Sequence, residues 1–79
     1  MIRILFFGPV AERVGTRVLH VEHRPGRLLG ELRDELAALH PEAFAIACFA
    51  AVDGVQVRDM SRVLEDTSEV AFMARFSGG

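Results

Sequence analysis

Residues 27–39 read Arg-Leu-Leu-Gly-Glu-Leu-Arg-Asp-Glu-Leu-Ala-Ala-Leu, and no other stretch of the chain constrains its fold as strongly. The leucines recur mostly at intervals of three and four, which is typical of an amphipathic helix with one apolar stripe. That stripe comprises Leu28, Leu29, Leu32, Leu36 and Leu39. Burying four or five leucines at about 2 kcal/mol each gives on the order of 10 kcal/mol of gross stabilisation. We therefore expect this helix to be the main cohesive element of the domain.

Two residues refine the helix prediction. Gly30 lies inside the helix and weakens it by about 1 kcal/mol relative to alanine. Because a glycine allows another backbone to come close, we expect a close backbone contact at Gly30. Pro41 follows the helix and marks its end.

Short apolar segments that read as β-strands lie on both sides of the helix. The expected strands are residues 2–7, 16–23, 48–52, 55–57 and 69–76, with a short helical turn at residues 10–14. Asp53 and Gly54 form a strong hairpin signal between two of these strands. Residues 43–47 fit no single class of secondary structure.

The order strand, strand, helix, strand, short strand, strand predicts an α+β domain, with a mixed sheet of four to five strands packed on one main helix. If the last strand lies parallel to the first, the arrangement is the β-grasp, or ubiquitin-like, fold. We expect this domain to span residues 1–76, and residues 77–79 to form a flexible tail that ends in Gly-Gly.

Composition excludes several classes of function. With 79 residues and a net charge of −2, the chain is one domain without the basic footprint of a nucleic-acid-binding protein. No stretch approaches the ~20 apolar residues of a membrane span. We expect no signal peptide, because the opening apolar run is too short for one. The single cysteine, Cys48, is expected to be an inert core residue. A lone cysteine also fits the reducing environment of the cytosol, so we expect a cytoplasmic protein. His20 and His23 face opposite sides of a strand, which argues against a metal site.

The strand alternation places some large apolar side chains outside the core. Leu5 and Phe7 fall on the same face as Arg3 in the first strand, and Met73 points outward from the last strand. If these strands pair, the three side chains become neighbours, and Phe76 extends the apolar line towards the tail. An exposed apolar patch on so small a protein indicates a partner-binding surface. The alternative is that a helix or loop covers these side chains.

Several segments resemble a known family, the small subunits of molybdopterin synthase, which are ubiquitin-like sulfur carriers (MoaD/ThiS family). The resemblance covers nearly the whole chain. It rests chiefly on residues 2–8 (Ile-Arg-Ile-Leu-Phe-Phe-Gly), 12–15 (Glu-Arg-Val-Gly), 69–73 (Glu-Val-Ala-Phe-Met) and 77–79 (Ser-Gly-Gly). Ala74 and Arg75 stand where the family commonly has two prolines, so this tail keeps backbone donors that proline lacks.

The resemblance implies a chemistry that takes place at the C-terminus. In such carriers, an activating partner of the ubiquitin-activating type (MoeB-like) uses ATP to adenylate the terminal carboxylate, here that of Gly79. A sulfur donor then displaces AMP and leaves a thiocarboxylate. The tail next enters the large subunit of molybdopterin synthase (MoaE-like), where its sulfur helps to build the dithiolene of the molybdenum cofactor.

The roles of individual residues follow from this implied chemistry. Gly78 and Gly79 provide an unhindered acyl terminus, and the expected partner contacts are Leu5, Phe7, Met73, Arg75, Phe76 and Ser77. The chain is not expected to be catalytic alone, to bind a metal or to hold a cofactor stably.

Two alternatives stay open on the sequence. One is a sulfur carrier for another pathway, such as thiamine thiazole or cysteine synthesis. The other is a ubiquitin-like interaction module without acyl chemistry.

Overall fold

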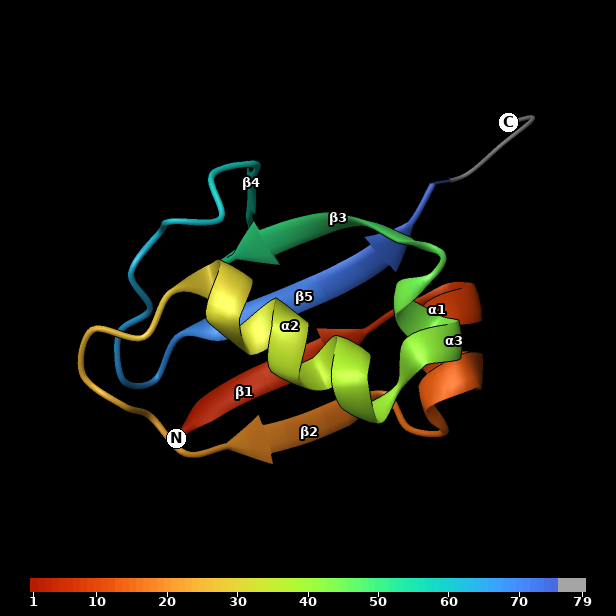
Figure 1. Cartoon of the computed structure of the whole chain (residues 1–79), viewed down its shortest axis with the longest axis horizontal. Coiled ribbons are helices and arrows are strands. Elements are labelled where there is room, and N and C mark those ends of the chain that lie inside the picture. Colours follow the sequence, from red (N-terminus) through yellow and green to blue (C-terminus); the bar gives the residue numbers. More distant parts are fainter. Residues whose placement is uncertain (76–79) are drawn as a thin grey trace.

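The computed structural model of the chain describes residues 1–75, apart from the side chain of Cys48. Five strands and three helices make up this part of the chain (Figure 1). In chain order they are β1 (Ile2–Phe6), α1 (Gly8–Val14), β2 (Val18–Val21), α2 (Leu29–Leu39), α3 (Pro41–Phe44), β3 (Ala47–Val52), β4 (Val55–Val57) and β5 (Glu69–Ala74).

The strands form one five-stranded mixed sheet in the order β2-β1-β5-β3-β4. The central pair, β1 and β5, is parallel, and the other three pairings are antiparallel. Helix α2 crosses one face of the sheet, as Figure 1 shows. The prediction of a β-grasp domain is therefore confirmed, including the position of the last strand beside the first.

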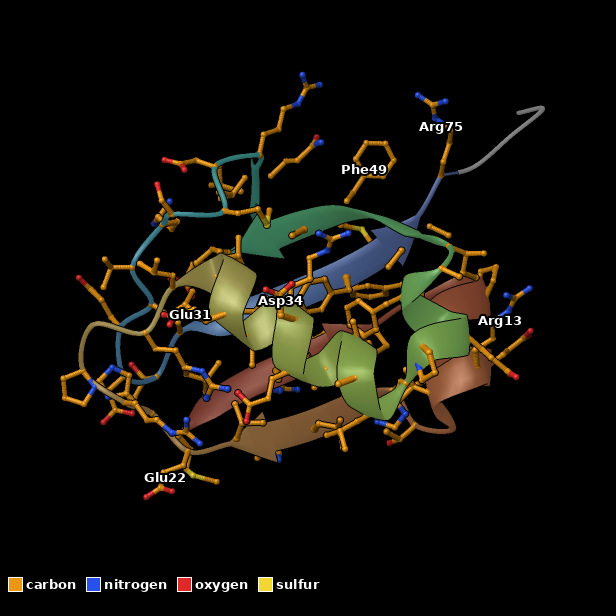
Figure 2. All side chains as sticks on the ribbon, viewed as in Figure 1. Arg13, Glu22, Glu31, Asp34, Phe49 and Arg75 are labelled. Atoms are coloured by element: carbon orange, nitrogen blue, oxygen red, sulfur yellow. The ribbon has the colours of Figure 1, made fainter. Side chains whose placement is uncertain are left out.

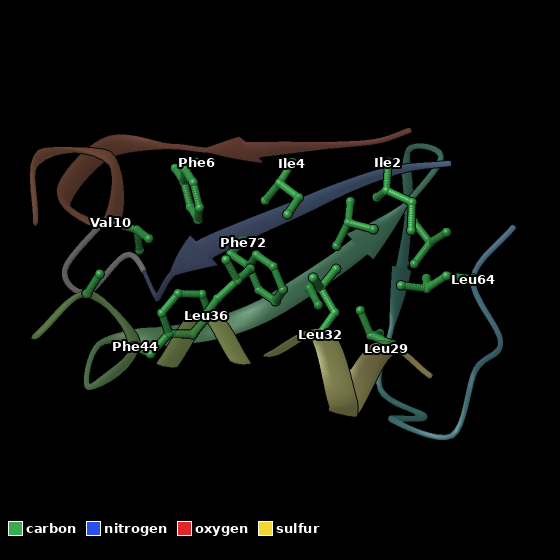
Figure 3. Packing of buried hydrophobic residues seen from close by; sticks show 14 residues of the cluster. Ile2, Ile4, Phe6, Val10, Leu29, Leu32, Leu36, Phe44, Leu64 and Phe72 are labelled. Atoms are coloured by element: carbon green, nitrogen blue, oxygen red, sulfur yellow. The ribbon is translucent and has the colours of Figure 1, made fainter. Parts of the chain in front are cut away.

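The core lies between α2 and the inner face of the sheet (Figure 3). Leu29, Leu32 and Leu36 contribute the buried side of the helix and are at most 3% exposed. Beneath one end of the sheet, three phenylalanine rings pack with centroid separations of 5.0 to 6.4 Å; they are Phe6, Phe44 and Phe72. Edge-on and offset ring contacts of this kind add to the stabilisation that burial provides.

The start of α2 is held by the loop that follows β4. The Gly30 N–H donates to the Met60 carbonyl over 2.8 Å, and the Leu29 N–H donates to the Arg62 carbonyl over 2.8 Å. These bonds satisfy donors that the first turn of a helix leaves unpaired. A Cβ at Gly30 would lie only 3.1 Å from the Met60 carbonyl oxygen, so the predicted close backbone contact at Gly30 is confirmed.

The prediction that Leu39 belongs to the buried stripe is wrong. Leu39 is 70% exposed, because α2 ends at this residue and α3 follows directly. Helix α3, which the sequence left unassigned, buries Ala43 and Phe44 in the core instead. Pro41 ends α2 as predicted and begins α3.

Several predicted boundaries also move. Strand β1 ends at Phe6, since Phe7 is the N-cap of α1, which begins two residues earlier than predicted. Strand β2 is four residues shorter than the predicted segment 16–23, and β5 ends at Ala74. The Asp53-Gly54 turn is confirmed, with both residues at positive φ (50° and 83°).

The buried stripe yields a matched pair of leucine variants. We expect Leu32→Ala to lower the free energy of unfolding by about 2–5 kcal/mol, because it removes a fully buried side chain and leaves a cavity. We expect Leu39→Ala to change it by less than about 0.5 kcal/mol, because Leu39 lies in solvent. Urea unfolding followed by circular dichroism measures both. Equal losses in the two variants would contradict the assigned core.

Candidate functional site

The face of the sheet opposite α2 carries an apolar row that crosses four strands, β2, β1, β5 and β3. The strand registers align Val18 with Leu5, Leu5 with Ala71, and Ala71 with Ala51. These residues alternate along their strands with core residues, so they face away from α2. Leu5 and Ala71 are half-buried, and no described helix covers them in Figure 1.

A second apolar row lies closer to the C-terminal end of β5. Phe49 of β3 is in register with Met73 of β5, and both side chains are half-buried. Figure 2 shows the Phe49 ring pointing away from α2. Together, Leu5, Phe7, Phe49, Ala71 and Met73 form what we call the outer-face patch.

The outer face becomes less polar towards the end of β5. At the start of β5, His20, Arg3 and Glu69 form a polar row, with Arg3 and Glu69 paired at 3.6 Å. The apolar rows follow in the direction in which β5 runs. The apolar part of the face therefore lies nearest to the point from which the C-terminal tail leaves the sheet.

Phe7 is placed differently from the sequence prediction but remains available to a partner. It follows β1 instead of belonging to it, and its N–H donates to the Phe72 carbonyl over 3.4 Å. Its side chain is 46% exposed. Phe7 also lines a hollow of about 710 Å³ between β1, α1 and the start of β2, whose other walls include Leu5, Ala11 and Val18. The outer-face patch thus continues into a concave surface.

Arg75 is exposed and directly follows the end of β5 (Figure 2). The remaining predicted site residues, Phe76, Ser77, Gly78 and Gly79, lie outside the described residues. The structure therefore brings together Leu5, Phe7 and Met73, with Arg75 at the point where the tail begins. It does not test the roles assigned to the last four residues.

Phe49 is the patch residue that sequence reasoning missed. The segment 48–52 is apolar throughout, so it read as a strand buried on both faces, and no alternation separated an inner from an outer side chain. The register shift between Ala47 and Phe49 further obscures the alternation. The pairing of Phe49 with Met73 becomes visible only in the sheet.

Two carboxyl groups outside the outer-face patch have lowered pKa values. Hydrogen bonds from Ser61 lower the pKa of Asp59, and the Met1 ammonium group lowers the pKa of Asp66. Asp66 lies near the start of β1, at the end of the sheet opposite the tail. Within residues 1–75, no cluster of His, Cys, Asp and Glu could hold a metal ion, and no helix has the length and hydrophobicity that a membrane span requires.

Comparison with protein families adds the deciding observation. The model of the ThiS family matches residues 4–79, which is nearly the whole chain. The chain belongs to the ThiS family. This is a family of ubiquitin-like sulfur carriers. The family membership that the sequence resemblance predicted is therefore confirmed. The comparison with curated proteins gives no match.

Solved structures share the fold of this ThiS-family chain. SAMP1 from Haloferax volcanii is 20% identical, with a TM-score of 0.82 over 99% of this chain and 98% of that one. The putative subunit 1 of molybdopterin converting factor from Pyrococcus furiosus is 16% identical, with a TM-score of 0.82 over 95% and 97%. A complex of subunits 1 and 2 of molybdopterin-converting factor from Helicobacter pylori gives 20% identity and a TM-score of 0.74 over 99% and 97%.

Adjacent phenylalanines test the separation between core and patch. We expect Phe6→Ala to lower the free energy of unfolding by about 3–5 kcal/mol, because Phe6 is 2% exposed and stacks in the aromatic cluster. We expect Phe7→Ala to change it by less than about 1 kcal/mol, because Phe7 is 46% exposed and lies outside the buried cluster. Thermal or urea unfolding distinguishes the two. A large loss for Phe7→Ala would assign Phe7 to the fold instead of to a partner.

Proposed function

We propose that this chain is the sulfur-carrying small subunit of a molybdopterin synthase. The observation that carries the proposal is the match to the ThiS family, which extends through Gly79. The similarity in fold to subunit 1 of two molybdopterin-converting factors supports the same pathway. We further propose that the protein acts in the cytoplasm, where such a carrier would meet its partners.

The proposed chemistry takes place on Gly79. An oxygen of its carboxylate attacks the α-phosphate of ATP on an activating partner, releasing pyrophosphate and forming an acyl-adenylate. Hydrosulfide from a sulfur source then attacks the carbonyl carbon of Gly79, the acyl bond to AMP breaks, and AMP and a proton leave. The product is a thiocarboxylate whose sulfur is the nucleophile for the synthase. Gly78 and Gly79 suit this role because a chain without side chains passes through a narrow active-site channel. The nucleotide site and the catalytic acids and bases are assigned to the partners.

The outer-face patch is the proposed docking surface for the large subunit of the synthase. It is apolar, exposes Phe7 and lies where β5 leads into the tail. A partner that covers the patch would therefore be close enough to receive the tail. Aromatic and methionine side chains are enriched in such interfaces, and Phe7, Phe49 and Met73 supply them here. Arg75, Phe76 and Ser77 are the proposed contacts between the patch and the active site.

Two other roles remain as outcomes of the tests. The fold similarity to SAMP1, which is described as a small archaeal modifier protein, is compatible with a ubiquitin-like module. A carrier for thiamine thiazole or cysteine synthesis would share the thiocarboxylate but deliver its sulfur to a different enzyme.

Mass spectrometry tests the carrier chemistry. After incubation with an activating partner, ATP and a sulfur source, we expect the intact protein to gain about 16 Da, because one terminal oxygen is replaced by sulfur. A variant with one residue added after Gly79 is the control, and we expect it to remain folded but unmodified. An unchanged mass of the natural chain would support an interaction module. Complementation of strains that lack either pathway then identifies the product.

Binding measurements test the docking surface. We expect Phe7→Ala to weaken binding to the synthase large subunit about tenfold or more, because truncating an aromatic anchor at an interface typically costs 1–2 kcal/mol or more. Leu39→Ala is the matched control, since Leu39 is also exposed but lies on α2, across the sheet from the patch. Isothermal titration calorimetry compares the two variants. If Phe7→Ala binds as tightly as Leu39→Ala, the patch is not the docking surface.

A further inference from the structure

A second hollow lies on the side of the sheet that carries α2. Its volume is about 300 Å³, and it lies between α2, β3 and the segment that begins with β4. Its apolar lining includes Ala50, Val57, Met60 and Phe72, together with Phe49, which is also part of the outer-face patch. Arg33 of α2 and Arg58, directly after β4, also line it and are exposed. The hollow therefore has an apolar floor with a cation on each of two separate elements.

The two arginines have no anionic partner within residues 1–75, unlike three others in the same chain. Arg3 pairs with Glu69, while Arg24 and Arg27 both pair with Glu35. By contrast, neither Arg33 nor Arg58 forms an ion pair in the described part of the chain. Two guanidinium groups beside one hollow thus keep their capacity to bind carboxylates.

The acidic residues next to these arginines in the sequence do not neutralise them. Asp34 follows Arg33 on α2, and adjacent helical residues do not face each other. Asp59 follows Arg58, but its carboxylate accepts hydrogen bonds from the Ser61 N–H at 2.9 Å and the Ser61 hydroxyl at 2.5 Å. The positive charge at the hollow is consequently available, although the whole chain has a net charge of −2.

The hollow also adjoins an open sheet edge. Strand β4 (Val55–Val57) is the last strand of the sheet, and its described partner is β3 alone. Val55 is 66% exposed. The free backbone groups of an edge strand can pair with an extended peptide, whose alternate side chains then reach the neighbouring pocket.

We propose that this hollow binds an extended acidic segment of a partner protein. The segment pairs with the free edge of β4, places an apolar side chain over Val57, Met60 and Phe72, and directs carboxylates to Arg33 and Arg58. The hollow borders the outer-face patch, since Phe49 belongs to both, but its α2 wall and its two arginines lie outside the patch. This inference does not depend on the pathway proposed above.

The test uses an acidic peptide and its charge-reversed counterpart. The full chain, labelled with ¹⁵N, is titrated with the acetylated peptide Glu-Asp-Val-Ile-Asp-Glu and separately with Lys-Lys-Val-Ile-Lys-Lys. The peptide concentration rises to about 5 mM, which detects dissociation constants in the millimolar range. We expect saturable chemical-shift changes with the acidic peptide, centred on Arg33, Gln56 and Arg58, and none with the basic peptide.

Charge reversal at the hollow provides the second arm. We expect the double variant Arg33→Glu, Arg58→Glu to weaken binding of the acidic peptide about tenfold or more, because it converts two exposed attractions into repulsions. Arg17→Glu is the control, since Arg17 lines the other hollow. Unchanged amide spectra away from the substituted sites would show that both variants are folded.

Three results would overturn the proposal. The first is an acidic peptide that fails to saturate any site. The second is a set of shift changes centred on Phe7, Arg17 or Arg75 instead of on the hollow. The third is equal binding by the double variant and by Arg17→Glu.

Discussion

The parallel pairing of β1 and β5 is the constraint on which the rest of the molecule depends. It joins the first and last strands of the chain, with Leu5 opposite Ala71 and Phe6 opposite Phe72. On the inner face this register stacks Phe6 against Phe72. On the outer face the same register brings Leu5 and Phe7 to the end of the sheet where the tail begins. Two parallel strands need a long crossover connection between them. The segment between β1 and β5, which contains α2, supplies this connection.

The two faces of the sheet perform different tasks because they meet different surroundings. The inner face is covered by α2 and holds the fully buried side chains that stabilise this small domain. No described helix covers the outer face. Its apolar rows can therefore contact a partner while the buried core between α2 and the sheet stays unchanged. Phe6 and Phe7, adjacent in sequence but 2% and 46% exposed, show how sharply the two roles separate. The hollow beside Arg33 and Arg58 adds a charged surface at the border of the inner face.

Much of the fold could be predicted from patterns of a few residues. The leucine spacing in α2, the Asp53-Gly54 turn and the alternation in β1 each reflect local geometry, and each prediction is confirmed apart from shifted ends. The errors arise where a distant segment decides the outcome. Leu39 continues the leucine spacing, but α3 fills the adjoining core. The sequence predicts that Phe7 lies within the first strand, but it is the N-cap of α1, which begins at Gly8.

The sequence by itself determined the order of the strands and of the main helix, the β-grasp arrangement and the membership of the carrier family. These follow from side-chain periodicity, turn residues and the segments shared with that family, all of which are readable along the chain. Only the tertiary structure decided which apolar side chains are left outside. Phe49 joins the outer-face patch because β3 pairs with β5. Arg33 and Arg58 line one hollow because the fold brings α2 and the end of β4 to its two sides. Such neighbours are far apart in sequence, so no local pattern records them until the sheet has formed.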